Sequence, residues 1–172
     1  MTLTVQDDTG TISAANGYVT EAEFIAYAAD RAMDHSAYVT ADIEAAIVIA
    51  TDYLDQRFRF VGERLSGFEQ ATEWPRVSAY DNHRNYVNGV PVQVKEACIE
   101  YAFRALSAVL NPDPTFDATG ATVKSKTEKV GPIAEETVYV DGRPISMPRY
   151  PAADKKLTRA GLTIRGGEVR RA

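Results

Sequence analysis

Histidine, cysteine and serine are the residues through which this chain could catalyse a reaction or hold a metal. Histidine occurs only at His35 and His83, and neither has a second histidine at a spacing of three or four residues, as a zinc-binding helix would. The single cysteine, Cys98, excludes an intrachain disulfide and falls on an apolar helical stripe, which predicts a small buried hydrophobe. No Gly-x-Ser-x-Gly motif or glycine-rich phosphate loop is present. We therefore expect no enzyme activity, no cofactor and no metal; a small hydrolase using His83 with Asp81 is the weakest alternative.

Two segments combine arginine with aromatic residues, the combination that binds single-stranded nucleic acid by stacking and charge neutralisation. Phe58-Arg59-Phe60 follows a predicted helix, and Arg84-Asn85-Tyr86 lies in a polar loop. With Arg57 and the basic C-terminus, they make a single-stranded DNA-binding accessory protein the alternative function. The net charge of −5 and the absence of lysine before Lys95 count against it, because dedicated binders carry a cationic stripe.

Charge is distributed unevenly along the chain. Residues 1–60 hold ten acidic residues and three arginines, a net charge of −7, whereas residues 141–172 hold eight basic and three acidic residues, a net charge of +5. Opposite signs at the two ends favour either head-to-tail self-association or a basic tail that binds an acidic or phosphate-bearing partner.

Apolar residues recur at helical spacings of three and four in three segments, which predicts helices near residues 21–32, 41–59 and 91–110. Thr20 and Glu23 form a capping box at the start of the first. Residues 63–88 are rich in Gly, Pro, Asn and Asp and are expected to form a long loop. From residue 121 to residue 140 the alternation predicts two paired strands, and residues 152–161 a last short helix.

The predicted fold is therefore mainly α. It is a small bundle of three main helices (16–112) with a short C-terminal helix, a β-hairpin or extended arm (121–140) and a C-terminal tail. We expect one domain over residues 1–150 and a docking tail over 151–172. No apolar run of eighteen residues exists and no signal-peptide pattern opens the chain, so we expect no membrane association and a location in the cytosol when the protein is made.

Several short motifs, taken in order, resemble tailed-bacteriophage head-tail connector or adaptor proteins, which complete the head beneath the portal. The motifs are Asn16-Gly17-Tyr18-Val19-Thr20, Ala50-Thr51-Asp52-Tyr53-Leu54, Trp74-Pro75-Arg76, Pro91 with Ala97, and Lys129-Val130-Gly131-Pro132. A group of similar phage proteins carries a DnaT-like label, which likens it to a primosomal single-stranded DNA-binding protein. Because the chain is acidic, we give that label less weight than the adaptor resemblance.

The adaptor resemblance implies a structural virion protein of the phage neck. Such a protein forms a homo-oligomeric ring, typically twelve-fold, that links the portal protein to a stopper or tail-completion protein and helps to close the DNA channel. It implies assembly in the host cytoplasm, a final place at the head-tail interface, and transient contact with genomic DNA. It assigns portal docking to Arg159, Arg165, Arg170 and Arg171, and contacts between subunits to Arg76, Lys124, Lys126 and Tyr139.

Trp74, Pro75 and Pro91 are expected to be structural. Trp74 either seals the bundle where the long loop crosses it, which we favour, or anchors an adjacent subunit. Pro75 fixes the direction of the chain next to it, and Pro91 suits the first turn of a helix, where no N–H is needed. Arg76 is the better candidate for an intersubunit contact, because its planar guanidinium can pair with a neighbour's carboxylate through two hydrogen bonds.

Overall fold

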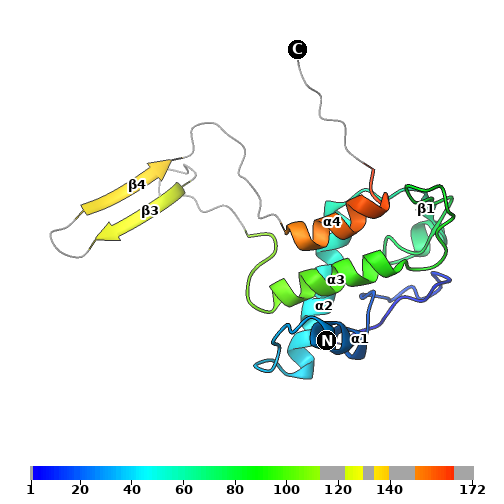
Figure 1. The fold of residues 1–172 in the computed structure, drawn as a ribbon, viewed down its shortest axis with the longest axis horizontal. Coiled ribbons are helices and arrows are strands. Elements are labelled where there is room, and N and C mark those ends of the chain that lie inside the picture. The colour runs from blue at the N-terminus through cyan, green and yellow to red at the C-terminus, as the bar shows by residue number, and fades with distance from the viewer. Residues whose placement is uncertain (1, 113–122, 130–133, 140–149, 165–172) are drawn as a thin grey trace, which may run out of the picture. The chain divides into compact units, whose positions relative to one another are not determined.

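Helices dominate the part of the chain that the structure describes. The computed structural model describes residues 2–112, 123–129, 134–139 and 150–164, with side chains for 2–112 and 150–164. Its elements are α1 (Glu21–Asp30), α2 (Thr40–Arg57), β1 (Glu63–Arg64), the 3₁₀ turn η1 (Gly67–Glu69), β2 (Arg76–Val77), α3 (Val92–Ala105), β3 (Val123–Lys129), β4 (Ala134–Tyr139) and α4 (Pro151–Ala160) (Figure 1). The predicted fold class, a small helical bundle with a β-hairpin, is confirmed.

The first helix begins where its capping residues predict. The Glu23 N–H donates to Thr20 Oγ1 at 3.1 Å, and the Thr20 N–H donates to Glu23 Oε2 at 2.8 Å. A cap of this kind stabilises a helix by about 1 kcal/mol. Val19 and Phe24, on either side of the cap, are fully buried. The start of α1 is therefore also the part of this helix that is attached to the core.

The core lies between α2, α3 and α4. Ile47 and Leu54 of α2 and Val94 and Tyr101 of α3 are fully buried, and each apolar side chain contributes about 1.5–3 kcal/mol through its removal from water. Cys98 of α3 lies between them and is also fully buried, and burial raises the pKa of its thiol to about 12. It is the small buried hydrophobe that its place on the apolar stripe predicts.

The last helix packs against α3 rather than standing apart. Ala153, Leu157 and Leu162 are at most 1% exposed, and the described residues 150–164 belong to the same compact unit as residues 2–110. The predicted short helix over residues 152–161 is present as α4. In Figure 1 this helix lies along α3, with which it makes extensive contact. The division into a domain over residues 1–150 and a tail over residues 151–172 stays a prediction.

Polar contacts hold α4 on the same surface. Asp154 accepts a hydrogen bond from the Tyr101 hydroxyl and pairs with Arg57 Nη2 at 2.7 Å. Lys156 Nζ lies 2.7 Å from a carboxylate oxygen of Glu96. The position of α4 is thus set by both apolar burial and charge pairing.

Residues Asn111–Pro148 form the second compact unit, whose described part is an antiparallel hairpin of β3 and β4. Lys126 pairs with Thr137 and Val123 with Tyr139, and the register is irregular between Val123 and Ser125, where Lys124 falls. The two predicted strands are present. The side chains of Lys124, Lys126 and Tyr139 lie outside the described part, so their predicted contacts stay predictions.

Within the described residues no helix combines the length and the apolar character needed to span a membrane. No group of three or more His, Cys, Asp and Glu side chains there is arranged to hold a metal ion.

Candidate nucleic-acid interface

The loop between Ala79 and Val87 presents two exposed tyrosines side by side. Tyr80 and Tyr86 are 52% and 53% exposed and form an antiparallel bridge, which the Val87 N–H closes by donating to the Ala79 carbonyl at 2.9 Å. Their ring centroids lie 5.7 Å apart at an interplanar angle of 68°. Exposed aromatic faces held by a local backbone pair can stack on unpaired bases.

Asp81 fixes the turn between the two tyrosines. Its carboxylate accepts hydrogen bonds from the His83 and Asn85 N–H groups, both at 2.8 Å, and from the Asn85 side-chain amide at 2.9 Å. These hydrogen bonds, the Asn85 side chain foremost, lower the pKa of Asp81. Arg84 therefore stands exposed at the tip of an ordered turn, in the left-handed region with φ of 63°.

The same turn is attached to the end of α4. The Asn82 side-chain amide donates to the Arg159 carbonyl at 2.6 Å, and the Asn82 N–H donates to the Ala160 carbonyl at 3.2 Å. Gly161 follows with φ of 74°, and a Cβ there would lie 2.1 Å from Asn82 Oδ1. Only glycine permits both the helix end and this close approach.

Beyond Gly161 the chain runs along the segment that leaves α2. Thr163 forms an antiparallel bridge with Phe60, the Val61 N–H donates to the Leu162 carbonyl at 3.0 Å, and the Ile164 N–H donates to the Arg59 carbonyl at 2.7 Å. Residues 159–164 are thus flanked by the Arg84 turn on one side and by Arg59 on the other. Three segments that each carry an arginine are therefore joined around the end of α4.

These cations differ from the others in having no carboxylate partner among the described side chains. Arg31, Arg57, Arg64, Arg76, Lys95 and Lys156 all form ion pairs. Among residues 2–112 and 150–164 the cations without such a pair are Arg59, Arg84, Arg104, Lys155 and Arg159. Arg159 lies on the last turn of α4 and Lys155 one turn earlier, Arg59 and Arg84 lie on segments that are hydrogen-bonded to the end of this helix, and Arg104 lies apart on α3. Four of these five cations therefore belong to α4 or to segments joined to its end, and one of those segments carries the two exposed tyrosines.

Phe58-Arg59-Phe60 contributes only its arginine to this surface. Phe60 is 3% exposed, with its ring centroid 5.7 Å from that of Trp74, so it cannot stack on a base. Arg57, which the sequence placed in the DNA-binding set, is engaged by Asp154. Arg59 itself is exposed.

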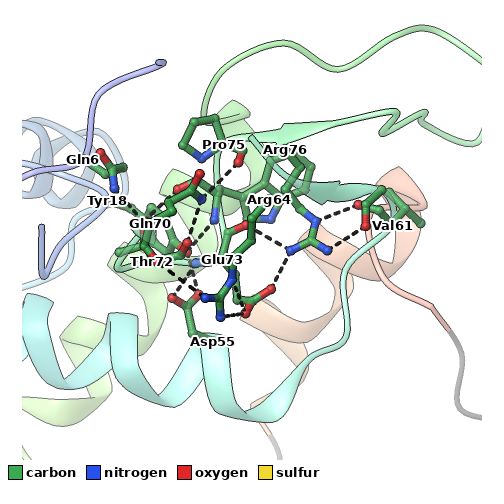
Figure 2. Close-up of polar contacts among 12 residues, drawn as sticks. Gln6, Tyr18, Asp55, Val61, Arg64, Gln70, Thr72, Glu73, Pro75 and Arg76 are labelled. Atoms are coloured by element: carbon green, nitrogen blue, oxygen red, sulfur yellow. Dashed lines mark hydrogen bonds and ion pairs between the residues drawn. The ribbon is translucent and has the colours of Figure 1, made fainter. Parts of the chain in front are cut away.

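A buried polar network holds the long loop behind this segment (Figure 2). The Tyr18 hydroxyl donates to Asp55 Oδ1 at 2.6 Å and accepts the Trp74 N–H at 3.1 Å, while Asp55 Oδ2 accepts the Glu73 N–H at 3.0 Å. Glu73 pairs with both Arg64 and Arg76. Burial raises the pKa of Asp55 to about 7.

The structural residues predicted from sequence lie within this framework. Trp74 is fully buried in the core, in the position of a plug, and the peptide bond to Pro75 is cis. Pro91 is the residue immediately before α3. Arg76 turns inward: its Nε donates to the Val61 carbonyl at 2.8 Å and its Nη2 to the Gly62 carbonyl at 2.7 Å. Its side chain is only 9% exposed, because these carbonyls and Glu73 surround it.

Of the four arginines predicted to dock a partner, the structure places Arg159 beside the turn of Arg84, while Arg165, Arg170 and Arg171 lie outside the described residues. Sequence reasoning missed Tyr80 and Asn82. The tyrosine pair could have been predicted, because Tyr80 and Tyr86 stand on either side of five polar residues, Asp81 to Asn85, that favour a turn. No local pattern pointed to the contact of Asn82 with α4.

Comparison with known proteins bears directly on this surface. A family model described as "Putative DnaT-like ssDNA binding protein" matches residues 1–171, almost the whole chain. No curated protein and no solved structure gives a significant match.

The match corrects the sequence-based identification. The resemblance to head-tail adaptors was wrong, because no head-tail connector family matches the chain. The predicted function in the phage neck, the portal partner and the ring assembly, which depended on that resemblance, are wrong with it. The family that matches is the DnaT-like one, whose label was given less weight. The DnaT-like label was given less weight because of the net charge of −5, but net charge does not show how charge is distributed over a folded surface. The chain belongs to the DnaT-like single-stranded DNA-binding protein family.

Proposed function

We propose that this protein binds single-stranded DNA through the surface at the end of α4, formed by Arg59, Tyr80, Arg84, Tyr86, Lys155 and Arg159. We call it the α4-end surface. The observation that carries the proposal is that an exposed tyrosine pair and the gathered cations without carboxylate partners coincide there. Family membership supports the same nucleic-acid class.

The tyrosine pair favours single strands over duplex. Base stacking on a side chain requires an unpaired base, and each stacked base contributes about 1–3 kcal/mol. Tyr80 and Tyr86 stand on a turn that Asp81 already orders, so little conformational entropy is lost when a base docks.

The arginines supply the attraction for the backbone. Because they are not neutralised by carboxylates of the described part, binding phosphate does not first require an internal ion pair to break. Each phosphate that an arginine neutralises releases condensed counterions, so we expect affinity to fall steeply with added salt. The proposed activity is binding without catalytic turnover.

Fluorescence anisotropy with a labelled single-stranded oligonucleotide tests the proposal. Each phosphate contact removed should lower the slope of log affinity against log salt by about 0.7. Arg84→Ala and Arg159→Ala should each do so, and unlabelled single strands should compete better than duplex. Arg104→Ala is the matched control, because that arginine also has no described ion pair but lies near Tyr150 at the opposite end of α4.

Affinity that does not depend on salt, or equal losses in the Arg84→Ala and Arg104→Ala variants, would contradict this location of the surface. Absence of single-strand binding by the full chain would contradict the function itself.

A further inference from the structure

A pocket of about 380 Å³ opens where α2 ends, next to the α4-end surface. We call it the α2-exit pocket. It is lined by Asp55, Gln56, Phe58, Arg59, Phe60, Gly62, Glu73, Arg76 and Ile164. Its volume falls within the usual range for small-ligand sites, and Arg59 belongs both to it and to the α4-end surface.

Charge at the pocket is balanced above about pH 7, where Asp55 is ionised. The carboxylates of Asp55 and Glu73 then stand against two arginines, Arg76 in the lining and Arg64 outside it, and Glu73 pairs directly with both. The cation left over is Arg59, which is exposed. A phosphate would therefore be held at Arg59, whereas the balanced interior suits a neutral group.

The wall chemistry fits the base of a nucleotide. Phe58 is half-buried and offers an aromatic ring, with Phe60 behind it at a centroid distance of 6.3 Å. Gln56 is exposed, and its amide can both donate and accept a hydrogen bond. Arg76 donates four hydrogen bonds, to Val61, Gly62 and Glu73, of the five that a guanidinium can make. The carboxylates of Asp55 and Glu73 accept five between them, of roughly eight that their lone pairs permit, so most of the spare capacity of the wall lies in the carboxylate oxygens.

We infer that the α2-exit pocket receives one base of a bound single strand, with the adjoining phosphate at Arg59, and that it prefers bases carrying an exocyclic amino group. This rests on the proposed function. An amino group donates to the carboxylate oxygens of Asp55 and Glu73, whereas the carbonyl of thymine or uracil at the same ring position faces oxygen with oxygen. One such hydrogen bond corresponds to roughly a two- to twelvefold difference in affinity.

The test compares short oligomers of cytosine, uracil and thymine deoxynucleotides at mildly alkaline pH by anisotropy with the full chain. Cytosine and uracil differ at the position of interest without the thymine methyl group. We expect the cytosine oligomer to bind more tightly than the other two. Phe58→Leu, which keeps apolar bulk but removes the ring, should lower affinity for the cytosine oligomer by about fivefold or more. Gln56→Ala should narrow the difference between cytosine and uracil.

Matched controls are Phe103→Leu, a similarly half-buried phenylalanine on α3, and Gln93→Ala, a glutamine on the same helix. Circular dichroism melting of every variant separates loss of binding from loss of folding. Equal affinity for all three oligomers, with unaltered binding by Phe58→Leu, would overturn the pocket assignment while leaving the α4-end surface standing. No binding to any oligomer would instead defeat the proposed function.

Discussion

Phe58-Arg59-Phe60 and Arg84-Asn85-Tyr86 have a similar mixture of arginine and aromatic residues, yet the fold uses them differently. In the first segment Phe60 packs on Trp74 in the core, Phe58 is half-buried and Arg59 is exposed. In the second, Arg84 and Tyr86 both face solvent on a turn held by Asp81. Residue type alone does not decide whether an aromatic ring stabilises the fold or is available for a ligand.

The difference lies in what packs behind each segment. Thr163 bridges to Phe60 and covers the first segment from one side, while Trp74 covers it from within. The second segment projects from a turn that begins at the buried Ala79 and is joined to α4 through Asn82. Contacts with residues distant in sequence therefore set the role of each segment.

The largest expected effect is on stability. Phe60→Ala should lower the free energy of unfolding by about 3–5 kcal/mol, because it leaves a cavity beside Trp74. Tyr86→Ala should change it by about 0.5 kcal/mol or less, because Tyr86 is exposed. Urea denaturation of both variants measures the contrast; similar losses in the two would erase the distinction between the segments.

Tyr86→Ala should instead weaken single-strand binding by about 1–3 kcal/mol through loss of a stacking face. Tyr86→Phe, which keeps the ring, should bind nearly as well as the original protein. Anisotropy titration gives both values, and an equal loss in the phenylalanine variant would show that the hydroxyl, not the ring, makes the contact.

Asp55, beneath the first segment, makes stability depend on pH. Burial raises its pKa in the folded protein from 3.8 to about 7, so between these values the folded state holds a proton that the unfolded chain releases. The protonated Asp55 therefore contributes to the free energy of unfolding. This contribution is complete below about pH 4, declines as pH rises and is lost above about pH 7. Asp55→Asn should remove a slope of roughly 1.4 kcal/mol per pH unit in that window. Urea midpoints measured across the window test it, and an unaltered slope would show that another group holds the proton.

The smallest expected effect is the difference between Arg59, in the first segment, and Arg57, immediately before that segment. Arg59→Ala should reduce the salt slope of DNA binding by about 0.7, whereas Arg57→Ala should leave that slope in place and lower stability slightly, because Arg57 pairs with Asp154. Salt titrations of the two variants provide the measurement. A reversed result would move the surface to the other side of α2.

Much of the fold followed from sequence, because it depends on local periodicity. The Thr20–Glu23 capping box, the apolar stripes of the helices and the paired strands were all predicted, and α3 ended at Ala105 rather than near residue 110. The binding surface could not be assembled in this way. The segments that carry Arg59, Arg84 and Arg159 are brought together by hydrogen bonds between positions distant in sequence, from backbone groups and from the Asn82 side chain, and net charge does not reveal this.

The hydroxyl of Tyr150 donates to the carbonyl of Leu110 at 3.5 Å, so the chain returns to the helical unit next to the point where it departs. Residues Asn111–Pro148 are therefore an insertion between adjacent positions. Doubling the length of such an excursion costs only about 0.6 kcal/mol of closure entropy. The length of residues 111–148 can therefore change at little entropic cost while α4 still completes the core.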